Sequence, residues 1–269
     1  MSRMHHIGQK IAKAMVIATK ISNFVEVYRH VLFSYPLQKI CLREGINIIA
    51  PESVDLWNHF NDIWLYRTYT SGGYDIKHGS IVVDVGANIG LFSLFAARYA
   101  EKVYSFEPYP PVFDYLVRNT SGNRISNVDC FNYAIGAGSG LRTIYLDPST
   151  TGSSFYPPIS RPASNLEKTQ VECKTLQEAL DAVGIDWCDF LKLDCEGSEF
   201  EITFSTPRDY LLARIGVISI ECHDELTEYT HVDLQRYLET IGFAAEVTIV
   251  RGNTAILKAR NVTKYPVMP

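Results

Sequence analysis

The feature that most constrains the fold is an alternation of short apolar runs with helical patterns, beginning near residue 80. The apolar runs have the length of strands, and they cover residues 81–85, 102–106, 127–133, 188–193 and 216–222. Apolar residues recur at helical spacing between or after these runs, at 89–100, 109–119, 175–183 and 231–241. Strand–helix alternation predicts an α/β fold, in which helices cover both faces of a doubly wound, mostly parallel sheet.

The last part of the chain departs from this alternation. Residues 243–250 and 254–259 both have strand composition, and only Arg251-Gly252-Asn253 separates them. Two strands joined by so short a turn pair antiparallel. We therefore expect a terminal antiparallel hairpin.

The first 75 residues lack the alternation and form, in our interpretation, an N-terminal helical extension that caps a domain at 76–269. Apolar residues at helical spacing over 7–33, with basic residues opposite, predict an amphipathic helix. Packing on the main domain or on a second subunit is the favoured role, and a homo-oligomer through this helix is one version of it. Binding to a membrane surface is the alternative. The stretch HFNDIWLYRTYT at 59–70 is a second expected helix.

Composition narrows the classes of partner. The net charge of −5 disfavours a nucleic-acid partner, because phosphate binding depends on clustered Lys and Arg. None of the six cysteines lies in a C-x-x-C pair, which disfavours zinc and favours free thiols. No apolar run approaches the roughly 18 residues of a transmembrane helix. With no signal-peptide pattern either, the expected location is cytoplasmic.

A ligand site is indicated by IVVDVGANIG at 81–90. Gly86 allows a tight turn and close approach of a ligand, and Gly90 allows the next helix to start against the strand. The dinucleotide fingerprint G-x-G-x-x-G needs another glycine where Asn88 follows Ala87, so a pyrophosphate fits poorly. A nucleoside with an amino-acid tail fits better, and Asp84 is the candidate anchor for the ammonium of that tail, directly or through water.

The next strand supports a nucleoside ligand. Glu107 lies at its end, 23 residues after Asp84. A carboxylate at this place in an α/β fold can accept hydrogen bonds from both ribose hydroxyls.

These motifs carry a family resemblance. VVDVGANIG, FEP and LKLDCEGSEFEI resemble the FkbM family of S-adenosylmethionine-dependent methyltransferases over about residues 60–259. The resemblance implies a Rossmann-like, seven-stranded sheet with a reversed last strand. It also implies which residues bind the cofactor. Those around the methionine part are Asp84, Gly86, Asn88 and Gly90, and Glu107 holds the ribose. Ala134 falls beside adenine, where an alanine leaves recognition to backbone and packing.

Further charged residues follow the fourth and fifth strands, at the edge where ligands of open α/β sheets bind. Asp194 and His223 are the candidate catalytic residues, and His223 is the candidate general base because imidazole titrates near neutrality. A histidine bonded into the sheet edge is the competing interpretation. Asp194, Glu221 and His223 are also suitable ligands for a divalent metal. We prefer the metal-free arrangement, in which Asp194 faces the ammonium of the cofactor.

The sequence thus predicts an O-methyltransferase that uses S-adenosylmethionine. Its expected partner is a small-molecule or glycan acceptor with a hydroxyl, on a sugar, a glycan or a polyketide-like natural product. N-methylation stays open. An NAD-dependent oxidoreductase and a non-catalytic nucleoside-binding module are the alternatives. Residues 1–75 and a Pro/Ser/Thr-rich loop at 147–165 are expected to set the acceptor, with the loop covering its site.

Overall fold

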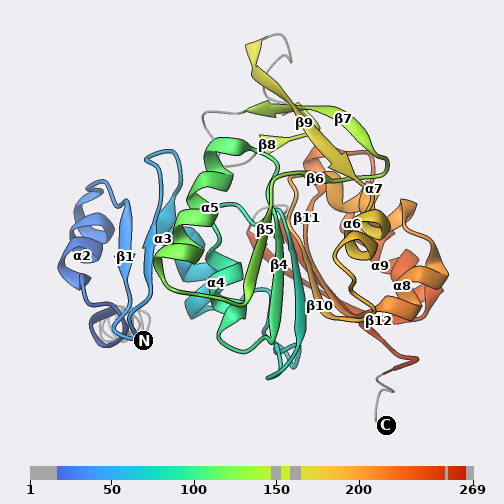
Figure 1. The fold of residues 1–269 in the computed structure, drawn as a ribbon, viewed down its shortest axis with the longest axis horizontal. Helices are drawn as coiled ribbons and strands as arrows, with labels where there is room; N and C mark the ends of the chain where they lie inside the picture. Colours follow the sequence, from blue (N-terminus) through green and yellow to red (C-terminus); the bar gives the residue numbers. More distant parts are fainter. Residues whose placement is uncertain (1–16, 147–152, 158–164, 252–253, 265–269) are drawn as a thin grey trace, which may run out of the picture.

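The computed structural model describes residues 17–146, 153–157, 165–251 and 254–264, and its centre is a seven-stranded sheet (Figure 1). The strand order is β12-β13-β11-β10-β3-β4-β5. Only β13 runs antiparallel to its neighbours, which confirms the predicted mostly parallel sheet and its terminal hairpin. The strands are β3 (Ile81–Val85), β4 (Lys102–Phe106), β5 (Val128–Phe131), β10 (Cys188–Leu193), β11 (Ile215–His223), β12 (Phe243–Arg251) and β13 (Thr254–Asn261).

Helices cover both faces of this sheet, as predicted (Figure 1). Because consecutive strand residues point to opposite faces, Val82 belongs to one buried cluster and Val83 to the other. The first cluster holds α4 (Leu91–Ala97), next to α5 (Pro110–Gly122). The second holds α6 (Leu176–Ala182), α7 (Ser198–Ser205), α8 (Arg208–Arg214) and α9 (His231–Ile241). Among the described residues, no helix combines the length and apolarity that a bilayer span requires.

The N-terminal extension is not the single helix expected over 7–33. Residues 1–16 lie outside the described part of the chain, and a helical turn at 17–20 ends where Ile21 forms a β-bridge with Leu42. The side chain of Asn23 accepts a hydrogen bond from the N–H of Cys41 at 2.8 Å, which holds the chain out of helical register. The extension then forms α2 (Phe24–Phe33), β1 (Lys39–Cys41), β2 (Asn47–Ile49), α3 (Leu56–Phe60) and a π-helical turn, η1 (Asn61–Leu65).

An aromatic seam joins this extension to the sheet domain. Phe60 stacks on Trp64 with ring centroids 5.6 Å apart, and Trp64 meets Phe95 of α4 edge-on at the same separation. The indole N–H of Trp64 donates to the carbonyl of Leu91 at 3.1 Å. The helix expected at 59–70 is therefore real as far as residue 65, and its buried face is continuous with the domain core.

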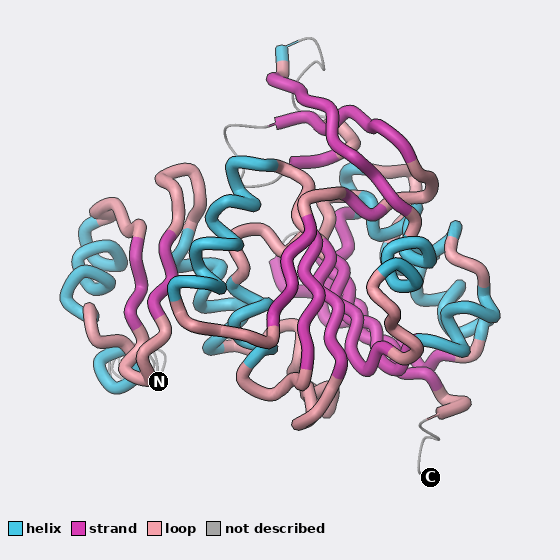
Figure 2. Tube along the Cα trace, viewed as in Figure 1, coloured by secondary structure: helices cyan, strands magenta, loops and turns pink. Residues whose placement is uncertain are grey.

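A small four-stranded sheet, which the sequence did not predict, follows β5 (Figure 2). The sequence gives little sign of this sheet because its longer strands are partly exposed. In β9 only Val171 and Cys173 are buried, so the apolar pattern is weak. Of the loop expected at 147–165, residues 153–157 are described and begin with a strand, while 147–152 and 158–164 lie outside the described residues. The strands are β6 (Ala134–Ile135), β7 (Gly140–Leu146), β8 (Ser153–Ser154) and β9 (Glu167–Lys174), in the order β6-β9-β7-β8.

Candidate active site

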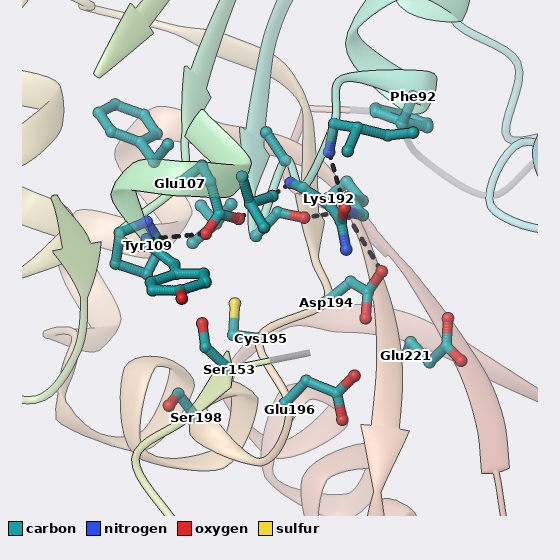
Figure 3. Close-up of a pocket in the computed structure, with 18 of the residues that line it drawn as sticks. Phe92, Glu107, Tyr109, Ser153, Lys192, Asp194, Cys195, Glu196, Ser198 and Glu221 are labelled. Carbon is teal, nitrogen blue, oxygen red and sulfur yellow. Dashed lines mark hydrogen bonds and ion pairs between the residues drawn. The ribbon is translucent and has the colours of Figure 1, made fainter. Parts of the chain in front are cut away.

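A cavity of about 450 Å³ lies beyond the carboxyl ends of the parallel strands (Figure 3). Its volume is within the range of small-molecule and cofactor pockets. Its lining comes from the ends of β3, β4, β10 and β11, from the small sheet, from α4, α5 and β13, and from residues of the extension between 53 and 69. The predicted ligand-binding edge of the sheet and the predicted capping extension therefore meet at one site.

Gly86 is required by packing between two strand ends. Its φ is +73°, and a Cβ at this position would lie 1.8 Å from the backbone oxygen of Asp194. Gly90 has a φ of +89°, and a Cβ there would lie 2.7 Å from Leu116 of α5. Gly86 also lines the cavity, whereas a side chain at Gly90 would collide with α5. The turn is glycine-rich because neighbouring elements approach closely.

Asp84 faces the protein interior. Its carboxylate accepts a hydrogen bond from Ser93 Oγ at 2.6 Å and lies 3.0 Å from the ammonium of Lys192, with no exposed surface. The cavity is lined by Lys192 and not by Asp84. Burial alone would lower the pKa of Lys192, but Asp84 and Asp194 outweigh burial and raise that pKa, so the ammonium stays charged. Of the two expected ways for Asp84 to anchor a ligand ammonium, direct contact does not suit this arrangement.

Glu107 presents an oriented carboxyl group to the cavity. Its Oε2 accepts the backbone N–H of Asn88 at 3.0 Å, and its Oε1 accepts that of Tyr109 at 2.9 Å. Burial raises the pKa of Glu107 to about 7, although both backbone donors oppose the shift. Asn88 lines the cavity and so does Ala134, which is buried in β6. Because two backbone N–H groups hold this carboxyl group from behind, its remaining lone pairs are available on the cavity side.

Three hydrogen-bonded side chains, Tyr69, Asp194 and Glu221, lie at the other end of the cavity. Tyr69 Oη lies 2.9 Å from Asp194 Oδ2 and is also hydrogen-bonded to Glu221 Oε2. A phenol has one proton, so both contacts are hydrogen bonds only when one carboxyl group is protonated. Burial raises the pKa of Glu221 to about 7, while Lys192 and His223 outweigh burial at Asp194 and lower its pKa. These opposite shifts favour the proton on Glu221 and the negative charge on Asp194.

His223 is surrounded by carboxylates. Its Nδ1 lies 3.0 Å from Glu199 Oε1, and its Nε2 lies 3.6 Å from Glu196 Oε2. Burial disfavours the charged ring, but Glu199 outweighs burial and raises the pKa of His223 well above its ordinary value. A protonated imidazole has no lone pair to accept a proton. The predicted general base is thus better described as a charged, sheet-edge histidine.

The three residues expected to bind a metal, Asp194, Glu221 and His223, do not form one cluster with metal-binding spacing. Among the described residues, the cluster with metal-binding spacing is Asp194, Glu199 and His223, whose ligand atoms lie within 4.8 Å of one another. Glu199 replaces the expected Glu221 in it, and its oxygens already accept the backbone N–H groups of Cys195 and Gly197 at 2.6 and 2.8 Å. These donors would compete with a cation, so the residues fit a metal poorly.

The sequence did not single out any of the extension residues that line the cavity, among them Tyr69 and His59. Tyr69 contacts Asp194 across 125 positions of the chain, and no local pattern around either residue announces this contact. His59 lies on α3, whose first turn is capped by Asp55, because Asp55 Oδ1 accepts the N–H of Asn58 at 3.1 Å. Burial lowers the pKa of His59. The one available signal was the helical pattern at 59–70, which placed a capping element here without identifying its functional side chains.

The fold is Rossmann-like, and its cavity lies beyond the carboxyl ends of the strands, where ligands of open α/β sheets bind. Residues 84–244 match the family model described as the methyltransferase FkbM domain, which is more than half of the chain. The protein therefore belongs to the FkbM methyltransferase family and is a methyltransferase. As a member of this family it uses S-adenosylmethionine as its cofactor.

The individual relatives described next share 30% or less of their aligned residues with this chain. The chain is 29% identical to the 31-O-demethyl-FK506 methyltransferase FkbM of Streptomyces tacrolimicus, covering 61% of this chain and 74% of that one. It is 30% identical to methyltransferase sdnD of Sordaria araneosa, covering 50% of this chain and 64% of that one, which is under two thirds of the relative's length. The crystal structure of methyltransferase FkbM from Methylobacillus flagellatus KT aligns with a TM-score of 0.48 and 16% identity, covering 94% of this chain and 60% of that one.

Proposed function

We propose that this protein transfers a methyl group from S-adenosylmethionine to a hydroxyl of a sugar, a glycan or a polyketide-like natural product. The supporting observation is the division of one cavity into two ends (Figure 3). Glu107, held by two backbone donors, lies at one end. Asp194 and Glu221 lie at the other, together with polar residues of the extension. A relative named for O-methylation of a natural product is in keeping with a hydroxyl acceptor.

The first end suits a nucleoside. In this proposal Glu107 accepts both ribose hydroxyls, and Asn88 and Gly86 line the adjoining turn. Ala134 lies in the wall of the cavity with apolar neighbours, so adenine is held by packing and backbone contacts rather than by a side-chain carboxylate. Gly90 contributes by setting the turn, and Asp84 by fixing the charged Lys192.

The second end suits a cationic methyl donor. When bound, the cofactor supplies a sulfonium, whose methyl carbon is attacked by the acceptor oxygen. Asp194 stays ionised here, and its charge favours a cation beside it. In the proposed arrangement Asp194 faces the cofactor ammonium without a metal, as its contact with Lys192 at 3.4 Å leaves an edge of the carboxylate towards the cavity.

The acceptor would enter between the extension and the small sheet. The extension contributes Ser53, Asp62 and Thr68 to the cavity lining, and the small sheet contributes Ser153 and Phe155. Hydroxyl and carboxylate groups with an aromatic ring beside them suit a polyhydroxylated ligand, because such groups exchange hydrogen bonds while the ring covers the apolar face of a sugar.

Calorimetric titration tests the donor half of this proposal. The protein should bind S-adenosylmethionine and S-adenosylhomocysteine but not NAD, whereas NAD binding would support the oxidoreductase alternative. Methyl transfer from tritiated S-adenosylmethionine to a panel of methyl glycosides and hydroxylated macrolides tests the acceptor half. Transfer to amines alone would replace O-methylation by N-methylation, and cofactor binding without transfer to any acceptor would favour a binding module.

A further inference from the structure

Methylation of a neutral hydroxyl needs a group that removes the proton. The acceptor oxygen forms a bond to the methyl carbon, the carbon–sulfur bond breaks with its electron pair left on sulfur, and the O–H proton must go to a base. His223 cannot serve while it is charged between Glu199 and Glu196. The base must therefore be sought elsewhere in the lining of the same cavity.

We infer that His59 of the N-terminal extension is the catalytic base that accepts this proton on an imidazole nitrogen. The inference rests on the proposed O-methyltransferase function and assigns a residue to its proton transfer. His59 and His223 are the two histidines that line the cavity among the described residues. His59 approaches from α3, on the side of the extension, whereas His223 ends β11. Two histidines therefore face one cavity from different elements, in different electrostatic settings.

His59 lines the cavity near Asp194. The charged groups that act on its ring most strongly are Asp194, directly after β10, Asp55 and Asp62 of the extension, and Lys192. Asp194 lies beside Glu221, at the end of the cavity away from Glu107 (Figure 3). A base at this end can reach an acceptor without displacing the nucleoside.

The same surroundings keep the ring of His59 in the form a base requires. Burial is the largest influence and lowers the pKa of His59, and it outweighs the attraction of Asp194, Asp55 and Asp62 for the charged form. Lys192 lowers that pKa further. A neutral imidazole at physiological pH can accept a proton directly.

Glu221 is the competing base, since it also lines the cavity. Its carboxyl group is hydrogen-bonded to Tyr69, which in turn contacts Asp194. Glu221 Oε2 is already bonded to Tyr69, so a proton accepted on this oxygen would have to displace that hydrogen bond. Glu221 and Tyr69 are better placed to position Asp194 than to remove a proton.

The protonation state of His59 can be measured without an acceptor. In the S-adenosylhomocysteine complex, ring ¹⁵N–¹H spectra should show His59 titrating below pH 6.5 and His223 remaining protonated well above it. Loss of one set of signals in His59→Gln assigns the ring, and His78→Gln, an exposed histidine outside the cavity, is the matched control. A His59 ring that titrates above pH 7 overturns the inference.

Kinetics with an acceptor from the panel tests the catalytic role. His59→Gln should lower kcat by roughly 10²–10⁴-fold, with the S-adenosylhomocysteine Kd and the acceptor KM within about threefold of wild type. The rise of wild-type kcat with pH through the His59 pKa should disappear in this variant. Added imidazole should restore part of the turnover of His59→Ala.

The outcomes distinguish failure of the His59 inference from failure of the proposed O-methyltransferase function. Near-normal kcat in His59→Gln, or a loss that imidazole does not rescue at all, would show that His59 is structural and would overturn the inference. A wild-type protein that methylates no hydroxyl in the panel would count against O-methylation itself. The titration of the His59 ring stands as an independent test in that case.

Discussion

The phenol of Tyr69 reaches across 125 positions of the chain to lie 2.9 Å from the carboxylate of Asp194. This contact joins the N-terminal extension to the end of β10, at the part of the cavity where the acceptor is proposed to bind. Glu221 bonds the same phenol from β11. One hydroxyl thus fixes two strand ends and the extension in a single arrangement, and four expectations about the site can be examined independently of the His59 inference.

Tyr69→Phe should destabilise the protein by about 1–3 kcal/mol, because Asp194 and Glu221 would both lose their shared hydrogen-bond partner in a buried setting. Urea unfolding measures the change. Tyr66→Phe is the matched control, since Tyr66 is 60% exposed and its substitution should cost less than about 0.5 kcal/mol. Equal stabilities for the two variants would contradict the bridging role of Tyr69.

Glu107→Ala should weaken S-adenosylhomocysteine binding by about 1.5–3 kcal/mol for each charge-assisted ribose bond that is lost. Glu101→Gln, exposed just before β4, is the control. Because burial raises the pKa of Glu107 to about 7, its accepting carboxylate form becomes populated as pH rises through that value. Affinity in wild type should increase over the same range. If calorimetry finds the same S-adenosylhomocysteine affinity in Glu107→Ala as in wild type, and no change in wild-type affinity with pH, Glu107 does not bind the ribose.

Gly86→Ala should prevent correct folding rather than only cofactor binding, because the added Cβ would lie 1.8 Å from the backbone oxygen of Asp194. Gly79→Ala is a closely matched control, since its φ of +82° is similar and a Cβ there would meet nothing within 4 Å. The control should lose only the roughly 1–2 kcal/mol of left-handed backbone strain. Thermal melts distinguish the two, and a Gly86→Ala protein as stable as Gly79→Ala would show that the strand ends can separate.

His223→Gln should reduce stability more at pH 6 than at pH 9. The pKa of His223 is raised in the folded protein above its unfolded value of about 6.5, so folding favours the protonated ring. That contribution is fully present below the unfolded pKa and is lost as pH rises through the folded pKa. Urea unfolding of wild type and variant at both pH values gives the comparison. A cost that does not depend on pH would mean that Glu199 and Glu196 do not hold a charged imidazole.

The sequence predicted most of the main sheet and much less of the site. The strands of the main sheet are signalled by buried apolar runs such as 81–85, and the parallel alternation then fixes their arrangement. The small sheet was missed because its strands are half exposed, so that β9 has no apolar run. Glu107 could be placed from spacing alone. Tyr69 and His59 could not, because their roles depend on the packing of the extension over the sheet, which no local pattern encodes.

The aromatic seam of Phe60, Trp64 and Phe95 has an evolutionary consequence. The ribose contact and the glycine turn lie within residues 84–134, whereas His59 and Tyr69 come from a segment that docks through these rings. In the proposed function, the ribose contact and the base are therefore encoded in different stretches of sequence. A segment exchanged between relatives with a compatible seam, and with a tyrosine retained to bond Asp194, would change the cap side of the acceptor site while leaving Glu107 and the glycine turn unaltered.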